Sequence, residues 1–236
     1  YLRTGIFRGN QIMLSHVCNI SSYSLAEMAI FNRAHYFGYF LLSIVLWTVW
    51  SFVMLQFPEI STTHSYSRGI ARIASLLLPA SIFLYFNREY LNEPKLVRGI
   101  ITGLILGFSL YLLHFSLNFI PAEVTVPTAG AVWLNWIIGS PFAEEVFFRG
   151  IVLRQELKSR PSWMAILISA VAFGIFHLPS WIIVQHQTIL ELATNSLSIL
   201  VYGIIFGIIY WSTRSIAASF IPHVSNNLIA QLIKPL

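Results

Sequence analysis

The chain has 236 residues, of which 56% are hydrophobic and only 10% are charged, with a mean hydropathy of +0.72. Soluble domains contain about 25% charged residues, so this composition excludes an ordinary soluble protein and indicates an integral membrane protein. The net charge of +5 is explained by membrane topology without a nucleic-acid partner, and the single cysteine, Cys18, excludes a disulfide framework and any multi-cysteine metal site.

Residues 1–35 are less hydrophobic and end in AEMAIFNRA, a stretch that can form a short amphipathic helix in the membrane interface. An arm that docks a membrane-protein partner is the alternative interpretation. Residues 36–236 are expected to form the transmembrane domain, because they contain successive apolar windows of about 20 residues, enough to span the hydrocarbon core as helices. These windows are approximately 36–57, 69–86, 99–120, 131–153, 162–184, 190–211 and 216–233. The sequence therefore predicts an all-α fold, a polytopic bundle of about seven transmembrane helices.

Lysine and arginine are distributed unevenly among the connections between these spans. Arg3, Arg8 and Arg33 precede the first span, and Arg88, Lys95 and Arg98 lie between the second and third. Arg154, Lys158 and Arg160 follow the fourth span, and Arg214 lies between the sixth and seventh. The connections near 58–67, 121–130 and 185–189 contain none. Because cytoplasmic loops retain positive charge, we expect a cytoplasmic N-terminus and a C-terminus outside. Arg68 and Arg72, at the outer start of the second span, do not fit this pattern.

The fourth predicted span contains the charged sequence SPFAEEVFFRG. Ionised groups near the bilayer centre cost at least ~2.5–3.5 kcal/mol each, so they usually face the protein interior and serve a function. Glu145 and Arg149 are four residues apart on one helical face and can pair, whereas Glu144 is rotated by about 100° and is neutralised less directly. For this segment alone, a buried structural ion pair is the alternative. The spacing predicts a structural Glu145 and an available Glu144.

Two later spans carry polar residues at helical spacing. In AFGIFHLPS, Phe173 and His177 lie four apart, so the phenyl ring can pack beside the imidazole. In SFIPHVSNNLIA, His223 and Asn227 project from one face just after Pro222. Taken singly, a histidine near a span end is an ordinary interfacial residue, and the His and Asn pair is an interhelical hydrogen bond. Three spans that offer a glutamate, a histidine, and a histidine with an asparagine favour one shared intramembrane site.

The stretches EEVFFR, FGIFH and HVSNN resemble the EExxxR, FxxxH and HxxxN motifs of the CAAX-protease and bacteriocin-processing family, abbreviated CPBP and also called Abi. Their order and spacing match, and the intervening YGIIFGIIYWSTRSI resembles the glycine-containing helix of that family. The similarity covers about residues 130–230. It implies a helical bundle of the bacterial plasma membrane around a conical catalytic cavity that opens toward the cytoplasm and the bilayer.

The implied activity is hydrolysis of a peptide bond in a membrane-associated substrate, such as a prenylated CAAX tail or a bacteriocin leader. By resemblance, Glu144 activates a water molecule held with His177. His223 and Asn227 then stabilise the oxyanion of the tetrahedral intermediate. The residues that shape and neutralise the site are Glu145, Arg149 and Phe173.

The mechanism expected from the sequence uses no cofactor, although a zinc site is a second possibility. Glu144, His177 and His223 are residue types that hold a catalytic zinc ion with one open position. A histidine ligand usually has a second carboxylate or carbonyl that orients its ring, and the nearest extra acid, Glu145, is expected to be paired already. The sequence therefore favours the metal-free glutamate mechanism.

Other intramembrane proteases are excluded by their motifs. The chain contains no aspartate for an aspartyl protease, no GxSG loop for a rhomboid-like serine protease, and no HExxH helix for a zinc protease. A second function class stays open, in which the chain is a catalytically idle scaffold, immunity or sensor subunit that binds a membrane partner. The complete motif set favours an active protease, because an idle site has no reason to keep charges that cost insertion energy.

Overall fold

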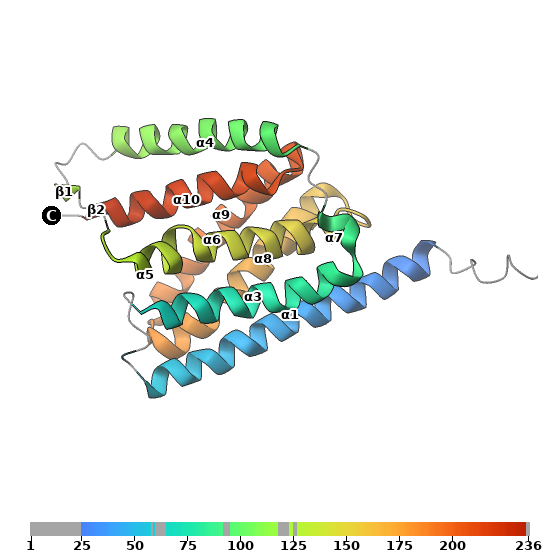
Figure 1. Cartoon of the computed structure of the whole chain (residues 1–236), viewed down its shortest axis with the longest axis horizontal. Helices are drawn as coiled ribbons and strands as arrows, with labels where there is room; N and C mark the ends of the chain where they lie inside the picture. Colours follow the sequence, from blue (N-terminus) through green and yellow to red (C-terminus); the bar gives the residue numbers. More distant parts are fainter. Residues whose placement is uncertain are drawn as a thin grey trace, which may run out of the picture.

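The computed structural model of the chain describes residues 25–57, 59, 65–91, 95–117, 123–124 and 127–234. Its helices lie side by side in an elongated bundle (Figure 1). The elements in chain order are α1 (Leu25–Gln56), α3 (Tyr66–Phe86), η2 (Arg88–Leu91), α4 (Leu96–Leu117), β1 (Glu123–Val124), α5 (Gly130–Val132), η3 (Trp133–Ile137), α6 (Gly139–Glu144), η4 (Glu145–Leu153), α7 (Arg154–Glu156), α8 (Ser162–Pro179), η5 (Ser180–Val184), α9 (Ile189–Thr213), α10 (Ile216–Leu232) and β2 (Ile233–Lys234).

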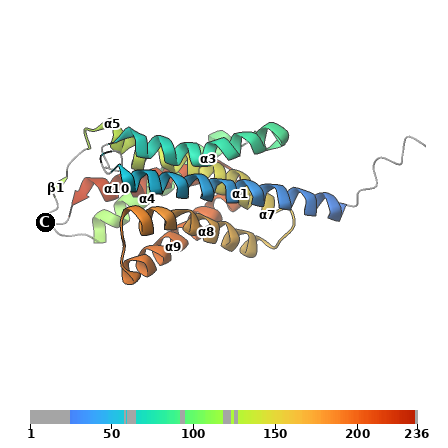
Figure 2. The same cartoon turned by 90° about the horizontal axis from the view of Figure 1, so that it is seen from below.

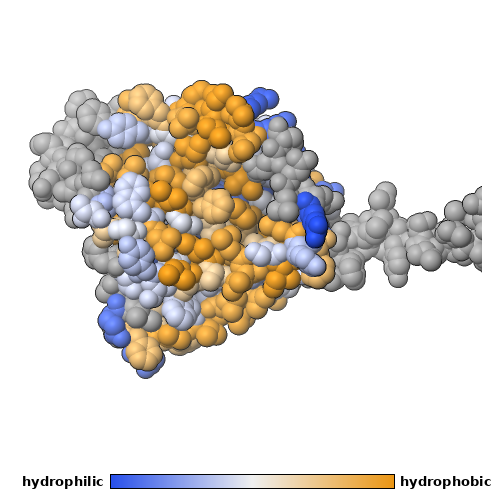
Figure 3. Space-filling view, in the orientation of Figure 1, coloured by the Kyte–Doolittle hydropathy of each residue, from blue (hydrophilic) through white to orange (hydrophobic). Residues whose placement is uncertain are grey.

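The predicted all-α bundle is confirmed. Among the described residues, the helices that are long and apolar enough to cross a membrane are Tyr36–Gln56, Tyr66–Phe86, Leu96–Leu113, Ser162–Val184 and Ile189–Thr213. The other two predicted spans are also rods of the bundle. The rod from α5 to α7 is divided into α and π segments and carries the charged motif, and α10 has 17 residues. Hydrophobic side chains cover most of the visible face between the two ends (Figure 3).

The predicted N-terminal arm falls partly outside the described residues, which begin at residue 25. From Leu25 onward the arm is helical and continues into the first span as the single helix α1. Its location in the membrane interface stays a prediction. At the other end of the chain, β2 pairs with β1 in a two-residue antiparallel bridge that does not change the fold class.

The core that supports the site is aromatic. Trp47 of α1 stacks on Phe176 of α8, with ring centroids 5.8 Å apart, and Phe148 of η4 lies edge-on to both Phe173 and Phe176. These rings are fully or almost fully buried, and buried aromatic pairs of this kind add about 0.5–1.5 kcal/mol each beyond the area they bury. The cluster joins α1, η4 and α8. Helix α9 packs along α8, on the side of the bundle away from α3 (Figure 2).

Small residues bring α4 and α10 together. A Cβ atom on Gly103 would lie 2.9 Å from the backbone oxygen of Ala217, and one on Gly107 would lie 2.5 Å from the hydroxyl of Ser225. Membrane helices without a hydrophobic driving force between them associate through such close contacts. The repeated four-residue spacing of glycine on α4 therefore fixes how α10, the helix of His223, is held.

The fourth rod changes its winding at the charged motif. Helix α6 ends at Glu144 and the π segment η4 begins at Glu145. Wider π turns are rare and occur frequently at functional sites. Both glutamates are buried, but Glu144 lines a cavity and Glu145 does not. Adjacent residues on a helix point about 100° apart, so the two acids lie in two different environments at the point where the winding changes.

Candidate active site

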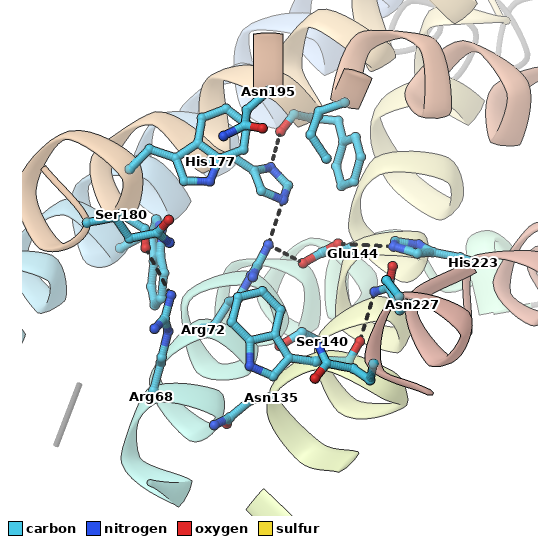
Figure 4. Close-up of a pocket in the computed structure, with 18 residues that line it drawn as sticks. Arg68, Arg72, Asn135, Ser140, Glu144, His177, Ser180, Asn195, His223 and Asn227 are labelled. Carbon is cyan, nitrogen blue, oxygen red and sulfur yellow. Dashed lines mark hydrogen bonds and ion pairs between the residues drawn. The ribbon is translucent and has the colours of Figure 1, made fainter. Parts of the chain in front are cut away.

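The sequence motifs meet at a cavity of about 410 Å³ inside the bundle. The residues of the three motifs that line it are Glu144, Phe173, His177, His223 and Asn227. They come from α6, α8 and α10, which the structure brings to one place (Figure 4). Glu145 and Arg149 lie behind this wall, with side chains that are 0% exposed. The arrangement therefore has a layer that faces the cavity and a layer that supports it.

Glu144 lies at the floor of the cavity with its side chain 3% exposed. One carboxylate oxygen, Oε1, is 2.7 Å from a terminal nitrogen of Arg72. The other, Oε2, is 3.7 Å from Nε2 of His223. The sequence suggested that Glu144 is neutralised less directly than Glu145. In the structure Glu144 has an arginine of its own, supplied by α3, which keeps the carboxylate in a favourable electrostatic setting.

His177 is oriented by two contacts. Its Nδ1 atom is 2.8 Å from the carbonyl oxygen of Phe173, one helical turn earlier. A carbonyl oxygen only accepts hydrogen bonds, so Nδ1 carries the proton and Nε2 of the neutral ring is an acceptor. That acceptor is 2.6 Å from the same nitrogen of Arg72 that pairs with Glu144. The guanidinium of Arg72 therefore lies between Glu144 and His177, the two residues that were expected to hold one water molecule.

Arg72 and Arg68 are functional candidates that the sequence motifs do not contain. Both line the cavity from α3. Arg68 lies over the ring of Trp136, 5.0 Å from its centroid, and its NH2 group donates to the hydroxyl of Ser180 at 3.5 Å. The signal for them was present, because they are the two arginines that did not fit the distribution of charge along the chain. Their inward position explains that exception.

His223 contacts both adjacent glutamates. Its Nδ1 atom is 3.0 Å from Oε1 of Glu145, and its Nε2 atom faces Glu144 across the 3.7 Å gap. The imidazole stacks on Phe206, with centroids 4.8 Å apart and planes 22° apart. These contacts hold the ring in one orientation, with one nitrogen toward the supporting layer and the other toward the cavity.

Asn227 lies one turn beyond His223 on α10. Its amide nitrogen donates to the carbonyl oxygen of Trp136 at 2.8 Å. The amide group has two N–H donors, and this bond uses one of them. Asn227 therefore ties α10 to η3 at the wall of the cavity, and the amide stays within the site.

Glu145 and Arg149 form the ion pair expected from their spacing, with 3.3 Å between NH1 and Oε1. The guanidinium is also 4.7 Å from the ring centroid of Phe173 and 5.7 Å from that of Phe206. Its NH2 group donates to the carbonyl oxygen of Gly203 at 3.3 Å. Contacts with aromatic faces favour a desolvated guanidinium. The pair thus stabilises the charge that Glu145 presents to His223.

The proposed zinc ligands do not converge on a common point. Among the described residues, no group of three or more histidine, cysteine, aspartate and glutamate side chains is placed to hold a metal ion. Between Glu144 and His177, the position that a shared ion would take is next to the Arg72 guanidinium. A fixed cation there repels a divalent ion, so these residues do not fit a zinc site.

Comparison with known proteins gives one match. Residues 126–229 match the family described as type II CAAX prenyl endopeptidase Rce1-like. No curated protein and no solved structure matches the chain. The matched stretch contains all three motifs, while α3 with its two arginines lies before it. Residues 126–229 are therefore similar to the Rce1-like family, and this match confirms the resemblance to the CAAX-protease and bacteriocin-processing family that the motifs predicted.

Proposed function

We propose that this protein is an intramembrane endopeptidase that hydrolyses a peptide bond of a membrane-associated substrate with water activated by Glu144. The observation that carries the proposal is the place of Glu144, a buried carboxylate at the floor of a cavity with Arg72 at 2.7 Å and His223 at 3.7 Å. A general base needs its ionised form and a position within reach of water. The match of residues 126–229 to the Rce1-like family supports the same reaction class.

The reaction follows from general acid and base chemistry at Glu144. Oε2 takes a proton from a water molecule in the cavity, and the water oxygen forms a bond to the carbonyl carbon of the scissile peptide. The electron pair of the carbonyl double bond moves to its oxygen and makes an oxyanion. The protonated Glu144 then gives its proton to the peptide nitrogen as the carbon to nitrogen bond breaks. The electron pair of the oxyanion re-forms the carbonyl double bond, and the products are an amine and a carboxylic acid, which then loses its proton to water.

Three groups around Glu144 supply stabilisation for the oxyanion. Nδ1 of His223 contacts Glu145 at 3.0 Å and its Nε2 faces the cavity, so an N–H group on Nε2 would donate to the oxyanion. The amide of Asn227, with a second N–H, and the guanidinium of Arg72 also line the cavity. Preorganised donors of this kind are usually the largest catalytic contribution. His177 acts with Arg72, whose position it fixes.

The orientation in the membrane is part of the proposal. The N-terminus is cytoplasmic and the C-terminus is outside, because the basic residues of the connections lie at one end of the bundle. Prenylated CAAX tails and bacteriocin leaders are the proposed substrate classes. No metal ion takes part, in keeping with the guanidinium between Glu144 and His177.

The experiment compares wild-type protein with Glu144→Gln in proteoliposomes. The probe is a farnesylated CAAX peptide with a fluorophore and a quencher on opposite sides of the modified cysteine. Glu144→Gln should abolish cleavage and leave the protein folded. The matched control is Glu191→Gln, because Glu191 caps α9 at an exposed position and glutamine can also cap. This control should cleave at the wild-type rate.

A second measurement covers substrates other than the probe. Glu144→Gln and wild type are each expressed in cells, and membrane proteins that cross-link to them are identified by mass spectrometry. A true substrate should accumulate uncleaved on Glu144→Gln and appear as fragments with wild type. A partner that stays intact on both, with no cleavage of the probe, would instead establish the idle scaffold.

A further inference from the structure

The two ends of the bundle differ in charge. Near the end where α7 lies, on the right of Figure 1, the described basic residues of the helix connections are Arg88, Lys95, Arg98, Arg154, Lys158, Arg160 and Arg214. Near the other end the described basic residues are Lys234, in β2, and the two arginines that line the cavity. The rule that cytoplasmic loops retain positive charge therefore assigns the α7 end to the cytoplasm.

The catalytic cavity reaches the opposite end of the bundle. Its floor contains Glu144 and His177, and its lining continues to Gln185, Asn195 and Gln231. Gln185 is exposed and follows η5, Asn195 lies in the second turn of α9, and Gln231 lies in the last turn of α10. These three positions are where α8 and η5 end, where α9 begins, and where α10 ends. The rim is therefore on the side that the charges assign to the outside.

The lining near the rim is suited to polypeptide. Carboxamide side chains provide hydrogen-bond donors and acceptors without a charge. They occur at the rim, and Asn135 and Asn227 place two more on the inner wall of the cavity. At the rim itself they form a chain, in which Asn195 donates to Gln187 at 3.0 Å and Gln187 donates to Gln185 at 2.9 Å. Groups of this type match the alternating N–H and C=O of an extended peptide.

We infer that the cavity opens on the extracytoplasmic face and receives there an extended segment of a membrane-anchored polypeptide. The inference rests on the proposed function, because the segment is the substrate of Glu144. It differs from the cytoplasmic opening implied by the family resemblance. The rim lies at the end of the bundle opposite α7, and the distribution of basic residues places that end outside the cytoplasm. An outer opening excludes, from the substrate classes proposed above, a prenylated CAAX tail presented at the cytoplasmic face. It keeps membrane-anchored polypeptides whose scissile bond lies on the outer side of the membrane.

The test uses single cysteines in a Cys18→Ser background. Gln185→Cys places a thiol at the rim, and the control Ser159→Cys places one at an exposed site in the connection between α7 and α8. Spheroplasts are treated with a membrane-impermeant maleimide, and the same variants are treated after lysis. Gln185→Cys should be labelled at least tenfold faster in spheroplasts than Ser159→Cys, and lysis should make both reactive.

Labelling of Ser159→Cys but not Gln185→Cys in spheroplasts would overturn the inference, and so would labelling of both or of neither before lysis. These outcomes do not depend on catalysis. An inactive Glu144→Gln with a rim that faces the cytoplasm would leave the protease assignment intact and remove only the outer opening. Full cleavage by Glu144→Gln, together with labelling of Gln185→Cys in intact spheroplasts, would remove the protease assignment and leave the outer opening intact.

Discussion

A terminal nitrogen of Arg72 lies 2.7 Å from Oε1 of Glu144 and 2.6 Å from Nε2 of His177. The guanidinium group of Arg72 therefore links the EEVFFR and FGIFH motifs, although Arg72 lies in α3, which contains neither motif. It pairs with the carboxylate of the proposed base, and it places positive charge where the oxyanion of peptide hydrolysis would develop.

Replacement of Arg72 by glutamine should lower kcat by about 100-fold or more, the loss typical of a missing oxyanion donor. Arg72→Lys keeps the charge but not the fork of donors, so it should retain part of the activity. Initial rates in proteoliposomes over a range of substrate concentrations give kcat and KM separately.

The comparison variant for this prediction is Arg68→Gln, one turn earlier on α3 and also in the cavity. Arg68 contacts Trp136 and Ser180, so its loss should change KM more than kcat. An Arg72→Gln protein that cleaves faster than wild type would show that the guanidinium blocks the base instead of assisting it.

Loss of Arg149 should be mainly a loss of stability. Arg149→Met leaves the fully buried Glu145 without its cation, which costs roughly 3–5 kcal/mol when burial is complete. The folded yield and the midpoint of thermal unfolding in detergent should both fall. The double variant Glu145→Gln with Arg149→Met removes both charges and should recover part of the loss. A double variant less stable than Arg149→Met alone would contradict the pairing.

The contact between α4 and α10 gives a prediction far from the chemistry. Gly103→Ala should destabilise the protein, because its Cβ atom would lie 2.9 Å from the backbone oxygen of Ala217. Gly174→Ala is the matched control in α8, since nothing lies within 4 Å of its Cβ position. This control should be neutral or stabilising, because alanine favours a helix over glycine by roughly 0.5–1 kcal/mol. Thermal unfolding of the two variants side by side measures the difference, and equal midpoints would argue against close packing at Gly103.

Metal removal should leave activity unchanged. The guanidinium of Arg72 is next to both Glu144 and His177, and a fixed cation disfavours a divalent ion at that place. Purified enzyme should keep its rate after prolonged treatment with a strong chelator, and elemental analysis should find well under one zinc ion per chain. Activity that disappears on chelation and returns with one equivalent of zinc would make the metal mechanism correct.

Features fixed by local spacing were accessible from the sequence. The ion pair of Glu145 with Arg149 and the contact of Phe173 with His177 both follow from residues four apart on one helix. The meeting of the three motifs in one cavity was inferred from the cost of placing polar groups in a bilayer. Each of these inferences uses a distance along a helix or a property of a single residue.

The contacts of Arg72 were not accessible in this way. They depend on how α3 packs against α6 and on how its arginine reaches His177 of α8, and no spacing within α3 encodes that geometry. The only indication of these contacts was an exception to the charge pattern, because two arginines lie on the side where few basic residues were expected. The end of the bundle at which the cavity opens also required the structure, because it follows from the rim residues of η5, α9 and α10 taken together.

The pairing of Arg72 with Glu144 has a consequence for the biogenesis of the protein. Helix α3 leaves the ribosome before α4 and α6, so Arg72 enters the insertion machinery before Glu144 exists. Arg72 is the seventh residue of α3, and an arginine inside an apolar span resists transfer into lipid while it is unpaired. We expect α3 to remain at the translocon, or beside a chaperone of membrane insertion, until α6 has been synthesised. Nascent chains truncated before α6 should therefore cross-link to that machinery through α3, and chains extended past Arg149 should be released.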